Sequence, residues 1–467
     1  MTDELASYCA TVPEPDDDTI EALRRHLLDW LGLVAGGREH ARSSASVLEA
    51  VNALAGHPGA GSTAEPITAN ASTIPTGSDL PGDRAALLGG TFAHSLDFDD
   101  THRESSLHPG APVIAAALPA ARATDASGAD LLSAISIGYD VTCAVGRAVD
   151  PDAHYARGFH LTATCGTFGA TAAVGHLHGF DADDFESAFG VNGSQAAGSL
   201  QFLANGAWNK RLHPGLAASR AVTAGALVAS GFRGAAAPIT GEFGFLHGYT
   251  DDPHPERLRD VTPGAAVRET ALKPYPCCRY LHAPLDGLLA LRQEVGLDPA
   301  TVERVTVDMP SPGVRLTGEP IERKRRPGNF VDCQFSAPFA AALAIGRGDA
   351  GLAAFLDAQD RLSSDELREL MDRVSVVSTD RTNAPFPELW PGHVVVETAD
   401  GTTHERTVDH ARGEPENPLS WDDVETKFRE LVGGTPLETR ADAVVESVAE
   451  LGGGGSADAL FEAIEAR

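Results

Sequence analysis

Alanine- and leucine-rich segments at helical spacing fill the first half of the chain and constrain its fold more than any other feature. The first follows the acidic run at 16–18 and keeps apolar residues on one face until Gly36-Gly37, where we predict that the helix ends. Similar segments follow at 84–96, 111–124, 128–148, 164–178, 183–200 and 216–231. Gly, Pro or Asp separates them and β-branched runs are few, so this half is predicted to be mostly helix.

A change of pattern after about residue 267 indicates a second module. Residues 302–309 alternate like a strand, and 394–408 resemble two strands joined at 399–401. Helical patterns lie between them at 283–293, 336–346 and 364–373, and helix returns from about Trp421. The predicted fold class is therefore mainly α with an α+β module. The predicted domains are 1–267 (helical), 268–411 (α+β) and 412–467, which rejoins the helical domain.

Composition narrows the classes of protein to which this chain can belong. Its 467 residues are 42% hydrophobic and 22% charged, which is typical of a soluble globular protein. No apolar run reaches the roughly 20 residues of a membrane span, and no basic and apolar leader begins the chain, so we expect a cytoplasmic protein. The net charge of -30 would repel nucleic acid and anionic membranes. The sequence has no Gly-x-Gly-x-x-Gly or Walker motif that would support a nucleotide cofactor.

Three polar islands interrupt the apolar scaffold, at 94–110, 158–162 and 208–215. The first island holds six polar candidates, the second holds His160, and the third holds Lys210 and His213. The six in the first are Asp97, Asp99, Asp100, Thr101, His102 and His108. Buried helices rarely carry so many proton-handling groups without a use. The islands therefore predict a single active site on which all three converge.

Lysine is scarce, and two of the four lysines stand in unusual surroundings. Lys210 lies in Asn-Lys-Arg-Leu-His-Pro-Gly and Lys273 in Ala-Leu-Lys-Pro-Tyr-Pro-Cys-Cys. A lysine can release or deliver a proton where an arginine does not. Together with Arg279 and the histidines, these lysines would form a positive pocket in a negative protein, which suits a small di- or tricarboxylate.

Such residues can remove a proton next to a carboxylate. This reaction needs a positioned base, His or Lys, and positive charge where the enolate-like charge develops. A second group could then protonate a departing hydroxyl (dehydration) or return the proton to the other face (epimerisation). The same pocket could instead stabilise the carbanion left by loss of carbon dioxide. We expect Asp97 to orient a histidine or to hydrogen-bond through Thr101.

Other interpretations compete with this one. A divalent metal in a hydrolase could be bound by Asp97, Asp99 and Asp100 together with His94 and His102. No second group of acids recurs to complete a dinuclear site, so no metal is predicted. Asp99-Asp100 could also be a helix terminus that faces solvent. A third possibility is a scaffold that binds a carboxylate without turning it over. Cys277-Cys278 lacks an activating signature for a thiol nucleophile.

At these motifs the chain resembles the MmgE/PrpD family over nearly its full length. Known members include 2-methylcitrate dehydratase, cis-aconitate decarboxylase and iminodisuccinate epimerase. The segments that carry the resemblance are 31–36, 93–101 with His108-Pro109, 158–162, Lys210 with His213-Pro214-Gly215, 273–277 with His282, and 335–338. The occurrence of all these segments in this order identifies the family, but it says much less about the substrate.

The resemblance implies a large helical domain formed by both chain ends and a smaller inserted α/β lid. It also implies a homodimer, no metal or organic cofactor, and a site in the cleft between domains. Carried over by motif, the catalytic candidates are His108, His160, Lys210 and Lys273. The substrate-binding candidates are Asp97, Thr101 and His282 from the motifs, with His213 and Arg279 from the positive pocket.

Two departures from the family pattern bear on the reaction. The decarboxylase branch has a pocket tyrosine after the first lid strand, where this chain has Leu316, and no tyrosine follows Tyr280. Phe339 stands where many relatives have tyrosine. We therefore expect a cofactor-independent lyase, a dehydratase of the 2-methylcitrate type. The alternatives are an epimerase of an iminodisuccinate-like dicarboxylate and a cis-aconitate-type decarboxylase.

Overall fold

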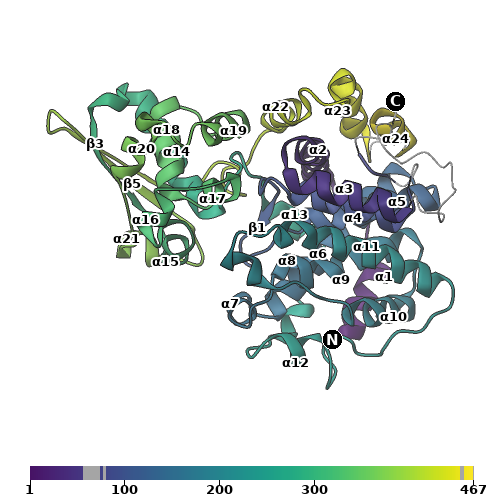
Figure 1. Ribbon diagram of the computed structural model, residues 1–467. Helices are drawn as coiled ribbons and strands as arrows, with labels where there is room; N and C mark the ends of the chain where they lie inside the picture. Colours follow the sequence, from purple (N-terminus) through teal and green to yellow (C-terminus); the bar gives the residue numbers. More distant parts are fainter. Residues whose placement is uncertain (56–73, 77–79, 453–456, 466–467) are drawn as a thin grey trace. The chain divides into compact units, whose positions relative to one another are not determined.

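The computed structural model describes residues 1–55, 74–76, 80–452 and 457–465, and the chain divides into two compact units (Figure 1). Unit 1 comprises Met1–Ala271 and Ser420–Arg467, and unit 2 comprises Leu272–Leu419. The boundaries fall a few residues beyond the predicted ones. At the first of them, β2 (Thr270–Ala271) pairs antiparallel with β1 (Thr101–His102) inside unit 1. The predicted class, mainly α with a smaller α/β part, is confirmed.

Unit 1 is built from helices drawn from both ends of the chain. The N-terminal part contributes α1 (Thr2–Thr11), α2 (Asp17–His40), α3 (Arg42–Ala55), α4 (Gly82–His94), α5 (Gly110–Thr124), α6 (Gly128–Ala148), α7 (Pro151–Ala156), α8 (Leu161–Thr164), α9 (Gly166–Leu177), α10 (Ala182–Gly193), α11 (Asn209–Ala229), α12 (Phe245–Tyr249) and α13 (Ala265–Arg268). The C-terminal part adds α22 (Trp421–Val432), α23 (Ala441–Glu450) and α24 (Ala457–Glu465). Most of the helices predicted from the apolar periodicity are thus present.

Helix α2 continues past the glycine pair that was predicted to end it. It begins after Asp16, whose carboxylate accepts from the Thr19 amide, and it ends only at His40. A Cβ on Gly37 would lie 2.0 Å from the Phe92 carbonyl oxygen, and one on Gly36 would lie 2.6 Å from Leu431 Cδ2. The prediction was wrong because these glycines allow close packing of neighbouring helices.

A similar close approach joins α4 to α11. A Cβ on Gly90 would lie 2.8 Å from the Gly215 Cα, and one on Gly215 would lie 2.2 Å from the Leu87 carbonyl oxygen. Helix α11 begins at Asn209 rather than at the predicted residue 216, so the third polar island forms its first turns. The two backbones can therefore touch, and this packing brings the first and third polar islands to one region of unit 1.

The C-terminal segment returns to hold the first polar island. Helix α22 packs beside α2, although the two come from opposite ends of the chain (Figure 1). The buried Lys427 Nζ lies 2.6 Å from Asp29 Oδ1 and donates to the Phe98 carbonyl at 2.9 Å. It also lies 3.8 Å from the centre of the Phe98 ring, a cation–π contact. The backbone between Asp97 and Asp99 is thereby tied to α22.

Unit 2 contains a four-stranded sheet in the order β4-β3-β5-β6. The predicted strands are confirmed as β3 (Val302–Asp308), β5 (Gly392–Thr398) and β6 (Thr403–Val408), which pair antiparallel in that sequence. The sequence patterns missed β4 (Val374–Val377), a four-residue strand that runs parallel to β3. The helices are α14 (His282–Val295), α15 (Ser311–Gly313), α16 (Ile321–Lys324), α17 (Phe330–Gln334), α18 (Ala337–Arg347), α19 (Leu352–Asp360), α20 (Asp365–Asp372) and α21 (Asp380–Asn383).

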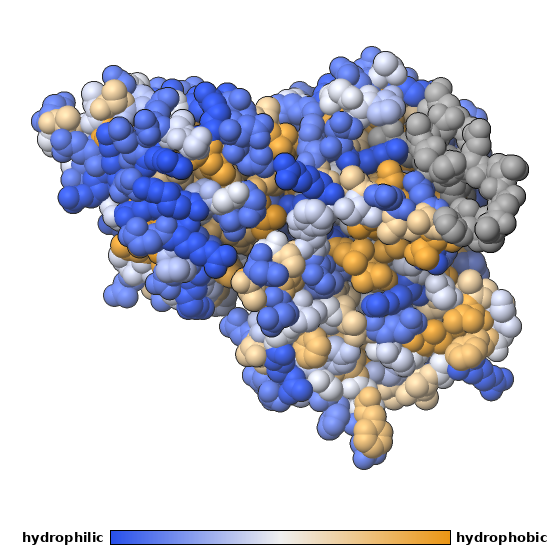
Figure 2. Space-filling view, viewed as in Figure 1, coloured by the Kyte–Doolittle hydropathy of each residue, from blue (hydrophilic) through white to orange (hydrophobic). Residues whose placement is uncertain are grey.

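Among the described residues, no single helix combines the length and apolar composition that crossing a bilayer needs, and α18 and α19 together meet these criteria only as a pair bent by 104°. Hydrophilic residues cover most of the face seen in Figure 2, with separate apolar patches between them. This surface agrees with a chain that carries a net charge of -30.

Removing one member of the buried Lys427–Asp29 pair should destabilise unit 1 strongly. Lys427→Met leaves the Asp29 carboxylate buried without its counter-ion, which typically costs about 3–5 kcal/mol. We expect a large fall in the midpoint of thermal unfolding. The matched control is the double variant Lys427→Met/Asp29→Leu, which removes both charges and should recover much of the loss. Equal losses in the two variants would contradict this account.

Candidate active site

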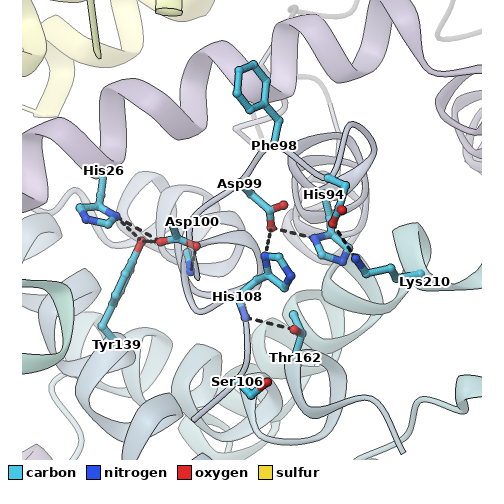
Figure 3. A network of polar contacts seen from close by, with 12 residues as sticks. His26, His94, Phe98, Asp99, Asp100, Ser106, His108, Tyr139, Thr162 and Lys210 are labelled. Atoms are coloured by element: carbon cyan, nitrogen blue, oxygen red, sulfur yellow. Dashed lines mark hydrogen bonds and ion pairs between the residues drawn. The ribbon is translucent and has the colours of Figure 1, made fainter. Parts of the chain in front are cut away.

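One carboxylate joins two histidines at the centre of the first polar island. His94 ends α4, Asp99 lies in the loop that follows, and His108 precedes α5. Asp99 Oδ2 is 2.7 Å from His94 Nδ1 and 3.3 Å from His108 Nδ1, and the two rings meet edge to face at 4.7 Å (Figure 3). The His108 backbone N–H donates to Thr162 Oγ1 at 3.1 Å, which links the first island to the second.

A second pair of histidines extends this group. His160 directly precedes α8, and His213 lies in the second turn of α11. Their Nδ1 atoms are 3.1 Å apart, so one carries a proton and the other accepts it. The His160 ring centre is 5.9 Å from that of His94. The structure thus brings together His108, His160 and His213, as the sequence predicted, and adds His94 to them.

Lys210 and Asp97 form an ion pair beside the histidines. Lys210 Nζ donates to Asp97 Oδ1 at 2.5 Å, and Asp97 adopts a φ of 51°, a conformation that aspartate tolerates better than most residues. Asp99 is the carboxylate that contacts His94 and His108, and the orienting role expected of Asp97 stays a prediction. Thr101 is buried in β1, and its Oγ1 has no hydrogen-bond partner among the described residues.

Burial keeps most of these imidazoles uncharged near neutral pH. It lowers the pKa of His94 and of His213 to about 4, and that of His160 well below the usual value, with neighbouring cationic groups adding to the effect. Because Asp97 also neutralises Lys210, unit 1 supplies less positive charge here than the sequence predicted. Without ligand, His94, His160 and His213 are therefore neutral, and Lys210 is paired with a carboxylate.

The neighbouring Asp100 faces away from the histidines into the scaffold. Its Oδ2 accepts from the Tyr139 hydroxyl at 2.5 Å and contacts His26 Nδ1 at 3.1 Å, while Oδ1 accepts from the Gly110 amide at 3.1 Å. Figure 3 shows the side chains of Asp99 and Asp100 diverging. Both are buried, so the alternative of a helix terminus that faces solvent is wrong. Asp100 thus anchors the loop to the scaffold, whereas Asp99 contacts His94 and His108.

Three of these residues could also supply ligands to a metal ion. Ligand-type atoms of His94, Asp99 and His108 lie within 4.8 Å of one another. This set differs from the predicted one, because Asp97 pairs with Lys210, Asp100 bonds Tyr139, and His102 bonds Ser105 at 2.7 Å. In the structure Asp99 Oδ2 contacts the Nδ1 atoms of His94 and His108 directly.

The remaining candidates lie in unit 2. Lys273 is buried just after β2, and His282 begins α14 with its Nε2 3.3 Å from the Cys277 carbonyl oxygen. Arg279 forms a buried ion pair with Glu414. A buried carboxylate therefore already balances the Arg279 charge. The roles of Lys273, Arg279 and His282 at the histidine cluster stay predictions.

Both parts of the chain match models of one protein family. The model of the MmgE/PrpD N-terminal domain matches residues 3–258, and that of the C-terminal domain matches residues 275–451. The chain belongs to the MmgE/PrpD family. The histidine cluster and the Lys210–Asp97 pair lie within the region that matches the N-terminal domain of the family.

Curated relatives of this MmgE/PrpD chain carry a single activity in their names. A cis-aconitate decarboxylase of Aspergillus terreus is 24% identical over 386 residues, which cover 79% of this chain and 78% of the relative. The cis-aconitate decarboxylase of Homo sapiens is 26% identical over 363 residues (75% and 72%), and that of Mus musculus is 27% identical over 364 residues (75% and 72%).

The depressed histidine pKa values predict that acid destabilises the folded chain. As the pH falls from 6.5 towards 4, unfolded chains bind protons on His94 and His213 while folded chains keep them neutral, so the unfolding free energy decreases. Each pKa unit corresponds to about 1.4 kcal/mol. Asp140 acts in the opposite direction, since burial raises its pKa to about 6.

The thermal unfolding midpoint, measured from pH 7.5 to 4.5 in wild type and in His213→Asn, tests this account. The variant should lose less stability on acidification, because one histidine that resists protonation is gone. Asp140 is common to both proteins and cancels from the comparison. Parallel curves would show that His213 is not held neutral by the fold.

Proposed function

We propose that this protein is a lyase that acts on a small di- or tricarboxylate by moving a proton next to a carboxylate, in a dehydration of the 2-methylcitrate type. Family membership and the named relatives support an enzyme of the lyase type. The observation that carries the proposal is the convergence of two different acid–base groups in unit 1, His108 with Asp99 and Lys210 with Asp97.

Dehydration is the reaction that uses both groups. One must remove the proton from carbon, and the other must protonate the departing hydroxyl. An imidazole that is neutral near pH 7 can accept a proton, and a lysine ammonium can donate one. We assign the base to His108 and the acid to Lys210. The neutral His160 and His213 would orient the substrate through hydrogen bonds.

A second candidate is decarboxylation of a cis-aconitate-like substrate. The relatives named above favour it, because they are cis-aconitate decarboxylases. That reaction breaks a carbon–carbon bond to release carbon dioxide, and the remaining carbanion then takes one proton. Decarboxylation therefore needs a single proton donor, and the second acid–base group would have no role in it.

Proton NMR in deuterium oxide can distinguish the reactions. Purified protein is incubated without added metal with 2-methylcitrate, citrate, cis-aconitate and iminodisuccinate in turn. Conversion of the methyl doublet of 2-methylcitrate to a vinylic methyl singlet, or a new olefinic signal from citrate, would support the dehydratase, and new proton signals of a product with one carboxylate fewer from cis-aconitate would support the decarboxylase. Deuterium incorporation into iminodisuccinate without a new product would indicate an epimerase. Tight binding without change of any substrate would leave a non-catalytic scaffold.

Lys210 should be needed for turnover as a proton donor as well as a charge. With the substrate that reacts, we expect Lys210→Met to lower kcat by about 10²-fold or more, the range of acid–base catalysis. Lys210→Arg keeps the charge but does not release its proton, so it should be almost as impaired. Unfolding midpoints close to wild type would show that both variants fold. Near-wild-type kcat in Lys210→Arg would contradict the role as acid.

A further inference from the structure

A residue outside the predicted catalytic set, Asp99, contacts the histidine that we assign as base. Asp99 is buried, and a single oxygen, Oδ2, faces the Nδ1 atoms of both His94 and His108. Its other oxygen, Oδ1, is buried without a hydrogen-bond partner among the described residues. Oδ2 thus hydrogen-bonds His94 Nδ1, and it lies at ion-pair distance from His108 Nδ1, which has no hydrogen-bond partner of its own among the described residues.

The charge of Asp99 decides which ring nitrogens carry protons. Burial alone would raise the pKa of Asp99, but His108 and His94 outweigh that cost and hold it well below its usual value. An ionised carboxylate can only accept hydrogen bonds. A carboxylate repels a lone pair on a nitrogen that faces it and attracts an N–H there, so a neutral imidazole with Nδ1 towards Asp99 is favoured with its proton on Nδ1 and a free lone pair on Nε2.

Exposure distinguishes the two histidines that share this carboxylate. The His94 side chain has 0% exposure, and its Nε2 is buried without a hydrogen-bond partner among the described residues. The His108 side chain retains 12% exposure, so its ring can meet a ligand. His108 is also fixed at its backbone, because its N–H donates to Thr162. Of the two histidines, His108 is the one with ring surface exposed for a ligand to contact.

We propose that Asp99 is a positioning residue that holds His108 as the Nδ1-protonated tautomer and directs its basic Nε2 to the substrate, with His94 as a second donor on the same oxygen. The inference rests on the proposed function for the role of His108 as base. The tautomer itself does not depend on any substrate. In this arrangement Asp99 never touches the reacting atoms, and it acts by orientation and by stabilising the imidazolium that forms when His108 takes the proton.

The test is the tautomer of His108, read from the side-chain nitrogen shifts of protein labelled with ¹⁵N-histidine. The signal is assigned by its loss in His108→Asn. In wild type we expect His108 to be predominantly Nδ1-protonated at pH 7.5. Predominant Nε2 protonation in wild type would overturn the proposal, and this outcome does not require any variant to fold.

Two substitutions at one position separate positioning from structure. Asp99→Ala removes the acceptor, so His108 should shift towards the Nε2-protonated form and kcat should fall by about 10²–10⁴-fold with a smaller change in KM. Asp99→Asn keeps an acceptor oxygen without the charge, so it should retain the wild-type tautomer and recover part of kcat. His94→Gln preserves a neutral donor to Asp99 and should leave the tautomer unchanged.

Other outcomes would refute the inference separately from the proposed function. An unchanged tautomer in Asp99→Ala would show that Asp99 does not select it. One equivalent of divalent metal in wild type, lost in Asp99→Ala, would instead make His94, Asp99 and His108 a ligand set. If no tested carboxylate reacts but the tautomer depends on Asp99, the proposed function fails and the positioning role stands.

Discussion

The loop between α4 and α5 depends on a buried carboxylate that takes no part in the proposed chemistry. Asp100 is held by Tyr139, His26 and the Gly110 amide, and together these contacts offset the cost of removing its charge from water. A Cβ on Gly110 would lie 2.3 Å from the Tyr139 hydroxyl, so glycine is required there. Because Asp97, Asp99 and His108 all stand on this loop, the site geometry follows from this anchor.

A second constraint comes from the far end of the chain. Lys427 holds the Phe98 carbonyl between the two functional carboxylates, and its charge is balanced by Asp29. The α4–α11 contact through Gly90 and Gly215 sets the approach of the third polar island. Unit 1 thus fixes the acid–base groups through rigid helices and paired charges, which is the arrangement that precise proton transfer needs.

The sequence predicted the elements better than the positions where they end. Apolar periodicity located most helices of unit 1 and three of the four strands of unit 2. It failed at Gly36-Gly37, because a glycine that ends a helix and one that admits a neighbouring helix look alike in sequence. It also placed the start of α11 too late, since Lys210, His213 and Pro214 interrupt the apolar pattern of a helix that is already formed. The four-residue β4 was too short to show alternation.

The sequence by itself determined the family, the mainly helical class, and the three polar islands whose histidines and lysine converge in unit 1. Only the tertiary structure decided which partner each aspartate of the first island contacts. Asp97, Asp99 and Asp100 are equally plausible partners in sequence, yet they face Lys210, the two histidines and Tyr139 respectively. Side-chain direction in an irregular loop follows from the backbone angles and from anchors distant in sequence, such as Tyr139 and Lys427. Local periodicity carries no information about either.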